Sequence, residues 1–356
     1  MVTRVMVTGG AGMLGRTLSR RLAADGHEVI SVDIRPAPDR HTDIRPAPDR
    51  HTGVRQAIAD IRDTPAMTRL ARGVHAVVHC AGALPSYPAD QISSVIVGGT
   101  RSVLAASATA RVERVVHISS TAVYGLPEQV PTPEGYPLRP VDTYGHAKVA
   151  AEAVCAQHRA RGMCVPILRP KTFLGPGRMG LFAMLFEWAE EGRNFPVLGS
   201  GNARIQMLAI EDLVAAVSRA LTAPRAVAGD TYNIAAAEFG TLREDFQAVL
   251  DAAGHHKRVV SLPARPALAG LKALDRARLS PVYGRLLHKL LADSHVSIAK
   301  AGERLGFVPR FSNREAILRT FAWWRDSRTG LPAQRGGRTS GDAWRQGALA
   351  LAKAFF

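Results

Sequence analysis

The chain has 356 residues, of which 46% are hydrophobic and 21% are charged, the composition of an ordinary globular protein. Its length suits one large domain or one domain with a smaller lobe. Cys80, Cys155 and Cys164 are too few and too scattered for a disulfide framework or a zinc site, so we expect a reducing, cytoplasmic setting. The sequence shows no signal peptide, and no apolar segment approaches the roughly 20 residues of a membrane span, so we expect no transmembrane segment.

The formal net charge is +16, and residues 255–356 hold 19 Lys and Arg against 6 Asp and Glu. An anionic substrate, a membrane surface or a nucleic acid would each account for this excess. A solvated basic surface also accounts for it, and we favour that interpretation because no nucleic-acid-binding motif accompanies the charge. We therefore expect a small-molecule substrate and no nucleic-acid partner.

Short β-branched segments alternate with helical patterns over residues 1–125. The predicted strands are Val5–Val7, Val29–Val32, Val77–His79 and Val115–Ile118, and the predicted helices are Arg16–Ala24 and Arg101–Ala110. The strands are continuously apolar, as buried parallel strands are. This alternation predicts an α/β protein of the Rossmann type, with a doubly wound parallel sheet and helices on both faces.

A glycine-rich segment, TGGAGMLG at Thr8–Gly15, lies between the first strand and the first helix. Gly9, Gly12 and Gly15 allow a tight turn, the approach of a pyrophosphate to the backbone, and close packing of the helix on the sheet. The positive end of the helix then faces the phosphates. Asp33 ends the second strand, where an acid binds ribose hydroxyls and repels a 2′-phosphate. These residues predict a dinucleotide site that prefers NAD to NADP.

Residues 33–42, DIRPAPDRHT, are repeated without change as residues 43–52. Two prolines in each copy predict an irregular loop, and two copies are too few for a solenoid. Only Asp33 follows an apolar segment and can end a buried strand, so the duplication lengthens a surface loop. After this loop, Asp60 is placed either to bind the adenine edge of the dinucleotide or to cap a helix.

Tyr144 and Lys148 are four residues apart, which places a phenol and an ammonium on one face of a predicted helix. A lysine cation and an oxidised nicotinamide favour the phenolate, so Tyr144 can act as general base in an oxidation and as general acid in a reduction. Ser119, Ser120 and Thr121 follow the fourth predicted strand, where a hydroxyl can hold the reacting oxygen beside Tyr144. The set predicts an enzyme that oxidises a secondary alcohol or reduces a ketone.

From about residue 166 proline and glycine become frequent, and helices are predicted again at Leu181–Glu191 and Glu211–Leu221. We expect residues 1–165 to form the NAD-binding Rossmann domain, and residues 166–330 to form a smaller C-terminal α/β substrate-binding lobe interleaved with the Rossmann core. Residues 331–356 are expected to be a basic, disordered tail. Its end, Trp344–Phe356, is either a short docking or membrane-contacting helix or a frayed terminus.

Seven segments together resemble the extended short-chain dehydrogenase/reductases, and among them the NAD-dependent epimerase/dehydratase branch. In chain order they are Thr8–Gly15, Asp33, Asp60–Asp63, His79–Gly82, His117–Gly125, Tyr144–Lys148 and Leu168–Gly177, and the likeness spans residues 3–325. The resemblance implies Ser120, Tyr144 and Lys148 as catalytic residues, NAD as cofactor, and a homodimer. The cofactor contacts that we expect are Gly9, Gly12, Met13, Leu14, Gly15, Asp33, Asp60, Ile61, Ala81, Tyr144 and Lys148.

The substrate contacts that we expect are Thr121, Thr172 and Arg204, although Arg204 is either a phosphate ligand or a surface arginine. Some positions depart from the patterns of the branch. Thr121 and Ala122 stand where dehydratases carry an Asp-Glu pair, which argues against dehydration. Thr172 stands where many members that act on sugar nucleotides have an asparagine on the diphosphate, which weakens that assignment. Ile96 replaces a frequent asparagine and puts a water relay through that side chain in question.

A leucine-rich segment gives a second indication of the substrate. Its apolar positions are Leu271, Leu274, Leu279, Leu286, Leu287, Leu290 and Leu291, with Arg285, His288 and Lys289 beside them. Members of the branch that act on steroid-like or lipid ketones resemble the chain here, but a packed amphipathic helix accounts for the stripe without a ligand and is favoured. The twelve histidines show no metal-ligand spacing with carboxylates or thiols, so we expect no metal.

Three hypotheses follow. The leading one is a nucleotide-sugar epimerase that oxidises its substrate transiently with bound NAD. The second is a net NAD(H)-dependent dehydrogenase or ketoreductase of a hydrophobic, steroid-like or lipid alcohol, supported by Thr172 and the leucine-rich segment. The third, a non-catalytic dinucleotide-binding protein, is disfavoured because such a protein has no need of the pair Tyr144 and Lys148.

Overall fold

The computed structural model of the chain describes residues 3–36, 53–177, 180–266, 269, 291–327 and 353. Most of the duplicated segment, the leucines from 271 to 290 and nearly all of the C-terminal tail lie outside these residues. No helix of the described part is long and apolar enough to cross a membrane.

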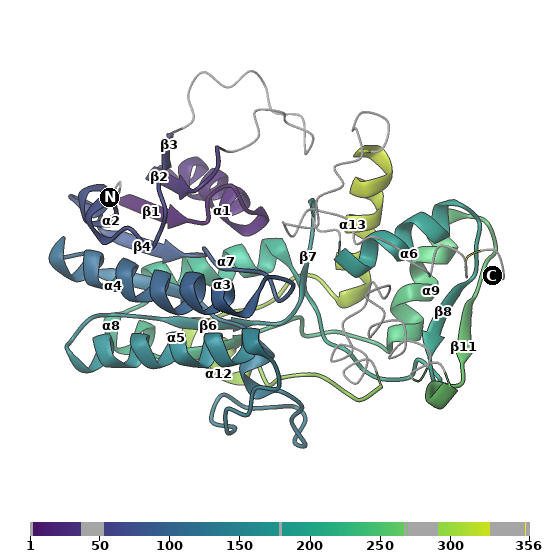
Figure 1. Ribbon diagram of the computed structural model, residues 1–356. Coiled ribbons are helices and arrows are strands. Elements are labelled where there is room, and N and C mark those ends of the chain that lie inside the picture. The colour runs from purple at the N-terminus through teal and green to yellow at the C-terminus, as the bar shows by residue number, and fades with distance from the viewer. Residues whose placement is uncertain are drawn as a thin grey trace.

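A seven-stranded sheet forms the centre of the molecule (Figure 1). All of its neighbouring strands are parallel, in the order β10-β6-β5-β4-β1-β2-β3. The strands are β1 Arg4–Thr8, β2 Glu28–Asp33, β3 Val54–Ile58, β4 Ala76–His79, β5 Arg114–Ile118, β6 Ile167–Pro170 and β10 Thr231–Ile234. The expected Rossmann-type α/β fold is therefore confirmed, including the four strands that the apolar segments predicted. Two further strands of this sheet, β6 and β10, come from the part of the chain after residue 165.

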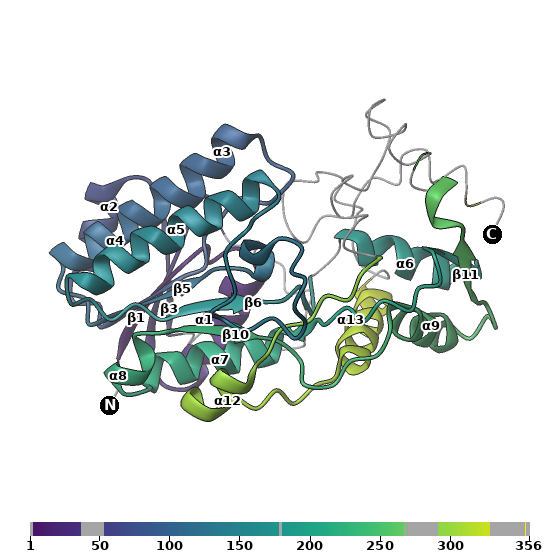
Figure 2. The ribbon, with the colours of Figure 1, turned by 90° about the horizontal axis from the view of Figure 1, so that it is seen from below.

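Helices cover both faces of the sheet, with α2, α4 and α5 on one face and α1, α7 and α12 on the other (Figure 2). Their bounds are α1 Met13–Ala24, α2 Thr64–Ala71, α3 Ala89–Ser93, α4 Gly99–Thr109, α5 Thr143–Ala160, α7 Ile210–Thr222, α8 Arg225–Ala228 and α12 Ala299–Leu305. A π-helical turn, Ser94–Gly98, joins α3 to α4, and a 3₁₀ turn, Thr121–Tyr124, follows β5.

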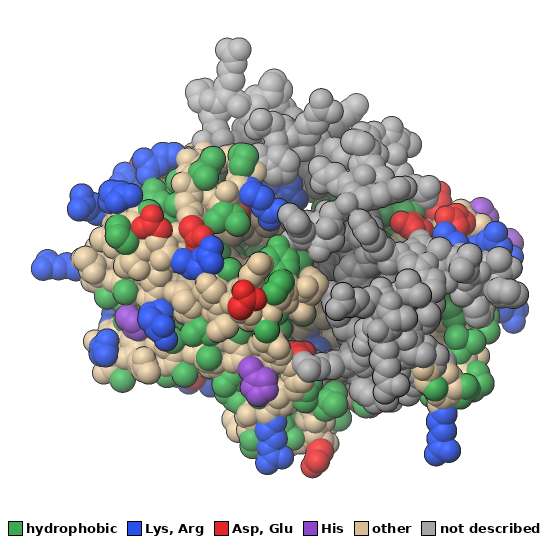
Figure 3. All heavy atoms as spheres, viewed as in Figure 1, with side chains coloured by type: hydrophobic (Ala, Val, Ile, Leu, Met, Phe, Trp, Pro, Cys, Tyr) green, Lys and Arg blue, Asp and Glu red, His purple; other side chains and the backbone are tan. Residues whose placement is uncertain are grey.

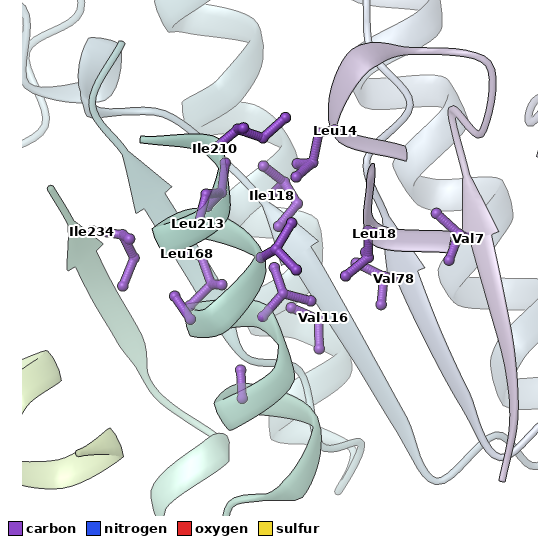
Figure 4. Close-up of a cluster of buried hydrophobic side chains, with 14 of the residues drawn as sticks. Val7, Leu14, Leu18, Val78, Val116, Ile118, Leu168, Ile210, Leu213 and Ile234 are labelled. Carbon is purple, nitrogen blue, oxygen red and sulfur yellow. The ribbon is translucent and has the colours of Figure 1, made fainter. Parts of the chain in front are cut away.

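The strands bury both faces, and each face has its own apolar core. Figure 4 shows the core under α1 and α7, where Leu14 and Leu18 meet Val7 and Val78 of the sheet and Leu213 of α7. Apolar burial of this kind contributes about 25 cal/mol per Å². The exception is the edge strand β3, whose Arg55, Gln56 and Ile58 are exposed.

A smaller lobe lies beyond one end of the sheet (Figure 1). It consists of α6 Gly180–Glu190, β8 Phe195–Leu198, α9 Leu242–Ala253, β11 Val259–Leu262 and α13 Asn313–Ser327, with a short parallel pair, β7 Phe173–Leu174 and β9 Leu208–Ala209, at its base. A separate aromatic core that includes Phe186, Trp188 and Phe321 holds the lobe together. On the face shown in Figure 3, Lys and Arg side chains are spread over the described surface and do not gather into one patch.

Candidate active site

The glycine-rich turn lies at the point where the strand order reverses, between β1 and β4. In doubly wound sheets a ligand crevice opens here, beyond the carboxyl ends of the strands. Gly9 has φ +72°, and a Cβ atom on it would lie 2.7 Å from the backbone nitrogen of Ala81. A Cβ atom on Gly15 would lie 2.1 Å from the carbonyl oxygen of Gly9. Both positions therefore require glycine. A side chain at Gly9 would collide with the backbone of Ala81, and one at Gly15 would separate helix α1 from the turn before it.

Helix α1 starts from this turn with Gly12 as its N-cap, and no side chain caps it. The first N–H groups of a helix have no partner within the helix, and they form an anion site together with the helix dipole. Met13 and Leu14 stand in this first turn, but their side chains are only 4% and 7% exposed and belong to the apolar core. Of these two residues, therefore, only the backbone can face a dinucleotide.

Asp33 ends β2 beside the same turn. Its Oδ2 accepts a hydrogen bond from the Ala11 N–H at 3.1 Å, and its Oδ1 accepts one from the Arg35 N–H at 3.2 Å. These two bonds hold the carboxylate next to the glycines. An acid in that position binds the ribose hydroxyls of NAD.

Asp60 binds a neighbour in the chain. Its carboxylate accepts hydrogen bonds from the Arg62 guanidinium, the shortest at 2.6 Å, and this pairing lowers the pKa of Asp60. Helix α2 is capped by Asp63, which accepts from the Ala66 N–H at 2.9 Å, so the interpretation of Asp60 as a helix cap is wrong. Ile61 is 5% exposed and is buried in the core between the sheet and α4.

Helix α5, which carries Tyr144 and Lys148, begins against the turn that carries Ser120. Asp142 caps it by accepting from the Gly145 N–H at 2.7 Å. A Cβ atom on Gly145 would lie 2.9 Å from the carbonyl oxygen of Ala122, so a glycine is needed for this close contact. Tyr144, one residue earlier and half-buried, is thereby brought next to the Ser120 turn.

The two serines after β5 have different environments. Ser119 is 3% exposed, and its hydroxyl donates to Glu152 Oε1 at 2.5 Å. Ser120 is half-buried, and its Oγ accepts from the Ala122 N–H at 3.2 Å, which leaves its own proton for another acceptor. Of the two, Ser120 is therefore the hydroxyl that can hold a reacting oxygen.

Lys148 lies one turn after Tyr144 and is 6% exposed. Its Nζ donates to the carbonyl oxygen of Ile118 at 2.8 Å and lies 5.7 Å from the centroid of the Tyr144 ring. A Cβ atom on Gly82 would lie 3.9 Å from this Nζ, which places Lys148 against the loop that follows β4. The ammonium therefore lies one helical turn from Tyr144 and beside the loop that follows β4.

The buried polar side chains near Lys148 are uncharged. His79 bonds Thr8 Oγ1 at 2.8 Å and Thr100 Oγ1 at 3.1 Å, and burial lowers its pKa to about 3. The ring of His117 lies 5.5 Å from that of His79, and burial lowers its pKa as well. Burial also raises the pKa of the Cys80 thiol to about 12. Burial therefore keeps these neighbours uncharged, and they add no charge beside the Lys148 ammonium.

A buried ion pair ties α5 to β6. Arg169 NH2 lies 2.6 Å from Glu152 Oε2, with side chains 7% and 6% exposed. Arg169 also donates to the Tyr124 hydroxyl at 2.8 Å, and this hydroxyl donates to Asn233 Oδ1 at 2.8 Å. This network was not predicted from the sequence, although Glu152 follows Tyr144 and Lys148 at helical spacing. The network fixes the position of helix α5 on the sheet.

Of the three expected substrate contacts, Thr121 and Thr172 lie on segments that contact each other, and Arg204 lies against Phe239. Thr121 Oγ1 donates to the carbonyl oxygen of Pro170 at 3.5 Å, which connects the Ser120 turn to the segment that contains Thr172. Thr172 and Arg204 are exposed. The guanidinium carbon of Arg204 lies 4.8 Å from the centroid of the Phe239 ring. In the described part of the chain, no group of three His, Cys, Asp or Glu side chains is placed to hold a metal ion.

Comparisons with known proteins agree with this architecture. The model of the NAD dependent epimerase/dehydratase family matches residues 5–235. The chain is 33% identical to the uncharacterized protein y4nG of Sinorhizobium fredii, over 95% of this chain and 83% of that protein. It is 30% identical to a 3 beta-hydroxysteroid dehydrogenase/Delta 5-->4-isomerase of Mycobacterium tuberculosis, over 90% of each chain. A UDP-glucose 4-epimerase of Mycolicibacterium smegmatis is 28% identical, over 91% of this chain and 99% of that protein.

Solved structures show the same fold. The UDP-glucose 4-epimerase of Thermotoga maritima with UDP-glucose has a TM-score of 0.74 and 22% identity, over 91% of this chain and 99% of that one. The dTDP-glucose 4,6-dehydratase DesIV of Streptomyces venezuelae with NAD bound has a TM-score of 0.72 and 26% identity, over 92% and 98% of the two chains. Together with the family match, these likenesses confirm the expected family and NAD as its cofactor.

Proposed function

The chain belongs to the NAD-dependent epimerase/dehydratase family, and we propose that it reversibly oxidises a secondary alcohol with Tyr144 as its acid–base residue. The observation that carries this proposal is the placement of Tyr144 and Lys148 one turn apart on α5, with the first turn of α5 packed on the turn that carries Ser120. Bound NAD supplies the hydride acceptor and donor.

In the proposed mechanism Tyr144 transfers the proton, Ser120 orients the substrate, and Lys148 stabilises the charge on Tyr144. In the oxidation, the Tyr144 phenolate accepts the proton of the substrate hydroxyl, and in the reduction the phenol returns it. The Ser120 hydroxyl donates a hydrogen bond to the substrate oxygen and keeps it beside Tyr144. The Lys148 ammonium stabilises the phenolate, and its bond to the Ile118 carbonyl fixes its position.

The cofactor site that we propose uses the backbone around Gly9, Gly12 and Gly15 for the pyrophosphate and Asp33 for the ribose. The close approach that Gly9 and Gly15 allow supports it, because a Cβ atom at either position would collide with backbone atoms. In this proposal residues 1–165 bind NAD, while the lobe formed by residues 166–330 binds the substrate, with Thr121, Thr172 and Arg204 as contacts.

Within this chemistry we favour a nucleotide-sugar epimerase that oxidises and re-reduces one carbon. Support comes from the likeness to a UDP-glucose 4-epimerase along nearly the whole of both chains. The positive charge of the exposed Arg204, which we propose as a substrate contact, also suits an anionic nucleotide. An epimerase returns its hydride in each cycle, so it gains nothing from releasing the cofactor.

A net dehydrogenase or ketoreductase of a hydrophobic alcohol is the second candidate. Thr172 favours it, because the exposed side chain there is a short hydroxyl and not the amide that many sugar-nucleotide enzymes place on the diphosphate. The 30% identity to the mycobacterial 3 beta-hydroxysteroid enzyme over 90% of both chains is a second reason. Such an enzyme exchanges NAD for NADH in every turnover.

One experiment separates these candidates. Freshly purified protein is denatured, and the released nicotinamide dinucleotide is quantified by chromatography. Near-stoichiometric NAD supports the epimerase, whereas empty protein that binds NADH reversibly supports the net oxidoreductase. The same protein is then tested with a panel of nucleotide sugars and of hydrophobic ketones. Failure of wild-type protein to convert any of them contradicts the proposed activity, and sedimentation analysis of the same sample tests the homodimer that we also propose.

A further inference from the structure

Four arginines line a cavity at the end of the sheet opposite the glycine-rich turn. Arg4 is the first residue of β1 and Arg55 is the second residue of β3, whereas Arg69 lies in the last turn of α2 and Arg72 is the C-cap of α2. The glycine-rich turn follows the carboxyl end of β1. Since a strand rises about 3.3 Å per residue, the four steps from Arg4 to Thr8 separate Arg4 from the start of that turn by about 13 Å. We call this site the arginine cavity.

The strand register turns Arg4 and Arg55 toward α2. Arg4 of β1 pairs with Glu28 of β2, Ile30 of β2 pairs with Arg55 of β3, and paired residues of neighbouring strands point to the same face. Glu28 and Ile30 are two residues apart, so they share a face as well. Ile30 lies in the same apolar core as Met67 of α2. Arg4, Glu28 and Arg55 therefore lie on the face of the sheet that α2 covers (Figure 2).

The side chain of Arg4 extends from the sheet to the loop that follows α2. A Cβ atom on Gly73, which has φ +69°, would lie 3.2 Å from Arg4 Nη1. Arg4 Nε donates to Glu28 Oε2 at 2.8 Å, and this bond uses one of the five N–H donors of the guanidinium. The arginine cavity has a volume of about 420 Å³, and small-molecule pockets measure about 300–1,000 Å³. The cavity is therefore large enough for an organic ligand.

Carboxylates do not balance the positive charge around the arginine cavity. Among the residues that the structure describes, no carboxylate pairs with Arg55, Arg69 or Arg72, and Glu28 is the one acid of the lining. Four guanidinium groups and one carboxylate give the lining a net charge of +3. The dipole of α2 accounts for Arg69 in its last turn, but it does not account for Arg55 on the edge strand. A cavity with this charge attracts an anion that carries several negative charges.

We propose that the arginine cavity binds an organic phosphate that carries at least two negative charges. Guanidinium groups match phosphate oxygens with paired hydrogen bonds, and such charge-assisted bonds are about twice as strong as neutral ones. A carboxylate brings one negative charge to a lining of net charge +3, whereas a phosphate ester brings about two. The ligand is bound apart from NAD, because the cavity and the glycine-rich turn lie at opposite ends of β1. The proposed reaction does not depend on it.

The lining of the cavity favours a small ligand over a nucleic acid. Surfaces that bind single-stranded nucleic acids are grooves that follow the backbone and carry aromatic side chains for base stacking. The described residues that line the arginine cavity include no Phe, Tyr or Trp. The arginines also surround one cavity of limited volume and do not form a stripe along the surface. A compact phosphate compound fits these features better than a strand of nucleic acid.

Calorimetric titration with inorganic pyrophosphate tests the site. The protein is first saturated with NAD, so that the glycine-rich turn is occupied, in a buffer without phosphate or divalent cations. The variant Arg55→Gln/Arg69→Gln removes two charges from the cavity and keeps polar side chains. Arg193→Gln/Arg258→Gln is the matched control, because these two arginines are exposed next to β8 and β11 of the lobe and their loss changes the net charge equally.

We expect wild-type protein to bind one pyrophosphate per chain, more tightly than inorganic phosphate. Arg55→Gln/Arg69→Gln should weaken pyrophosphate binding by about a hundredfold or more, as loss of two charged hydrogen bonds predicts. Arg72→Gln should weaken it by about tenfold, and the control variant should bind like wild type. Without ligand, the melting temperatures of the cavity variants should be no lower than that of wild type, because no described carboxylate loses a partner.

Three results would overturn the proposal. The first is the absence of saturable pyrophosphate binding to wild-type protein. The second is equal weakening by the cavity and control double variants, which would show attraction by net charge alone. The third is binding of a short single-stranded DNA that requires Arg55 and Arg69, without binding of pyrophosphate. If Arg55→Gln/Arg69→Gln melts below wild type, Arg72→Gln decides, and unchanged pyrophosphate binding by that variant also overturns the proposal.

Discussion

The buried pair of Glu152 and Arg169 connects helix α5, which carries Tyr144 and Lys148, to the sheet. Removal of one of the two charges tests how far stability and activity depend on this pair. Glu152→Gln keeps the size of the side chain but removes the negative charge at 2.9 Å from Arg169 Nε and 2.6 Å from NH2. The guanidinium then stays buried without its counter-charge, and Ser119 loses a charged acceptor. Breaking one partner of a buried pair costs about 3–5 kcal/mol, a large part of the about 5–15 kcal/mol that stabilises a typical domain.

Equilibrium unfolding in urea measures this loss. The double variant Glu152→Gln/Arg169→Met should recover much of it, because no buried charge is left unpaired. Asp25→Asn is the control, since Asp25 pairs with Arg21 at 2.9 Å on the surface and should change stability by less than about 1 kcal/mol. Turnover of Glu152→Gln should fall as α5 shifts. A loss of less than about 1 kcal/mol in Glu152→Gln would show that the pair contributes no more than an exposed ion pair does.

Three further predictions concern the cofactor site and pH. Gly15→Ala should greatly weaken NADH binding in a fluorescence titration, because its Cβ would meet the Gly9 carbonyl oxygen, whereas Gly98→Ala, with open space around its Cβ position, should not. Asp33→Ser should narrow the preference for NAD over NADP in the same titration, and an unchanged ratio would show that Asp33 is not the selecting residue. Burial raises the pKa of Asp245 to about 6, so its folded form favours the proton, and this stabilising contribution is lost as pH rises from about 4 to about 6. Thermal melts of wild type and Asp245→Asn should therefore diverge in favour of the variant above about pH 6, and parallel curves would contradict this.

The sheet could be predicted where its strands are buried on both faces. β1, β2, β4 and β5 are continuous apolar segments between helical patterns, and such an alternation is typical of a parallel sheet. β3 could not be predicted in the same way, because it is an edge strand and its exposed residues include Arg55 and Gln56. β3 pairs with β2 through its backbone, and its sequence shows no apolar pattern that would mark it as a strand.

The placement of the glycine-rich turn and of Tyr144 and Lys148 on one helix could be predicted from short motifs, because these features are local in the sequence. The contacts of Asp60 could not be decided from sequence, since its partner Arg62 and the true cap Asp63 lie only two and three residues further along the chain. The hydrogen bond of Lys171 with Ser294 could not be predicted either. Ser294 lies more than a hundred residues later, and only the folded lobe brings the two residues together.

The most direct test of the central claim is the turnover of Tyr144→Phe with whichever substrate the panel identifies, measured beside its dissociation constant for NADH. The phenylalanine keeps the ring but has no proton to transfer. We expect turnover to fall by about a hundredfold or more while NADH binding is unchanged. Turnover equal to that of wild type would contradict the proposed role of Tyr144, because the acid–base group would then lie elsewhere.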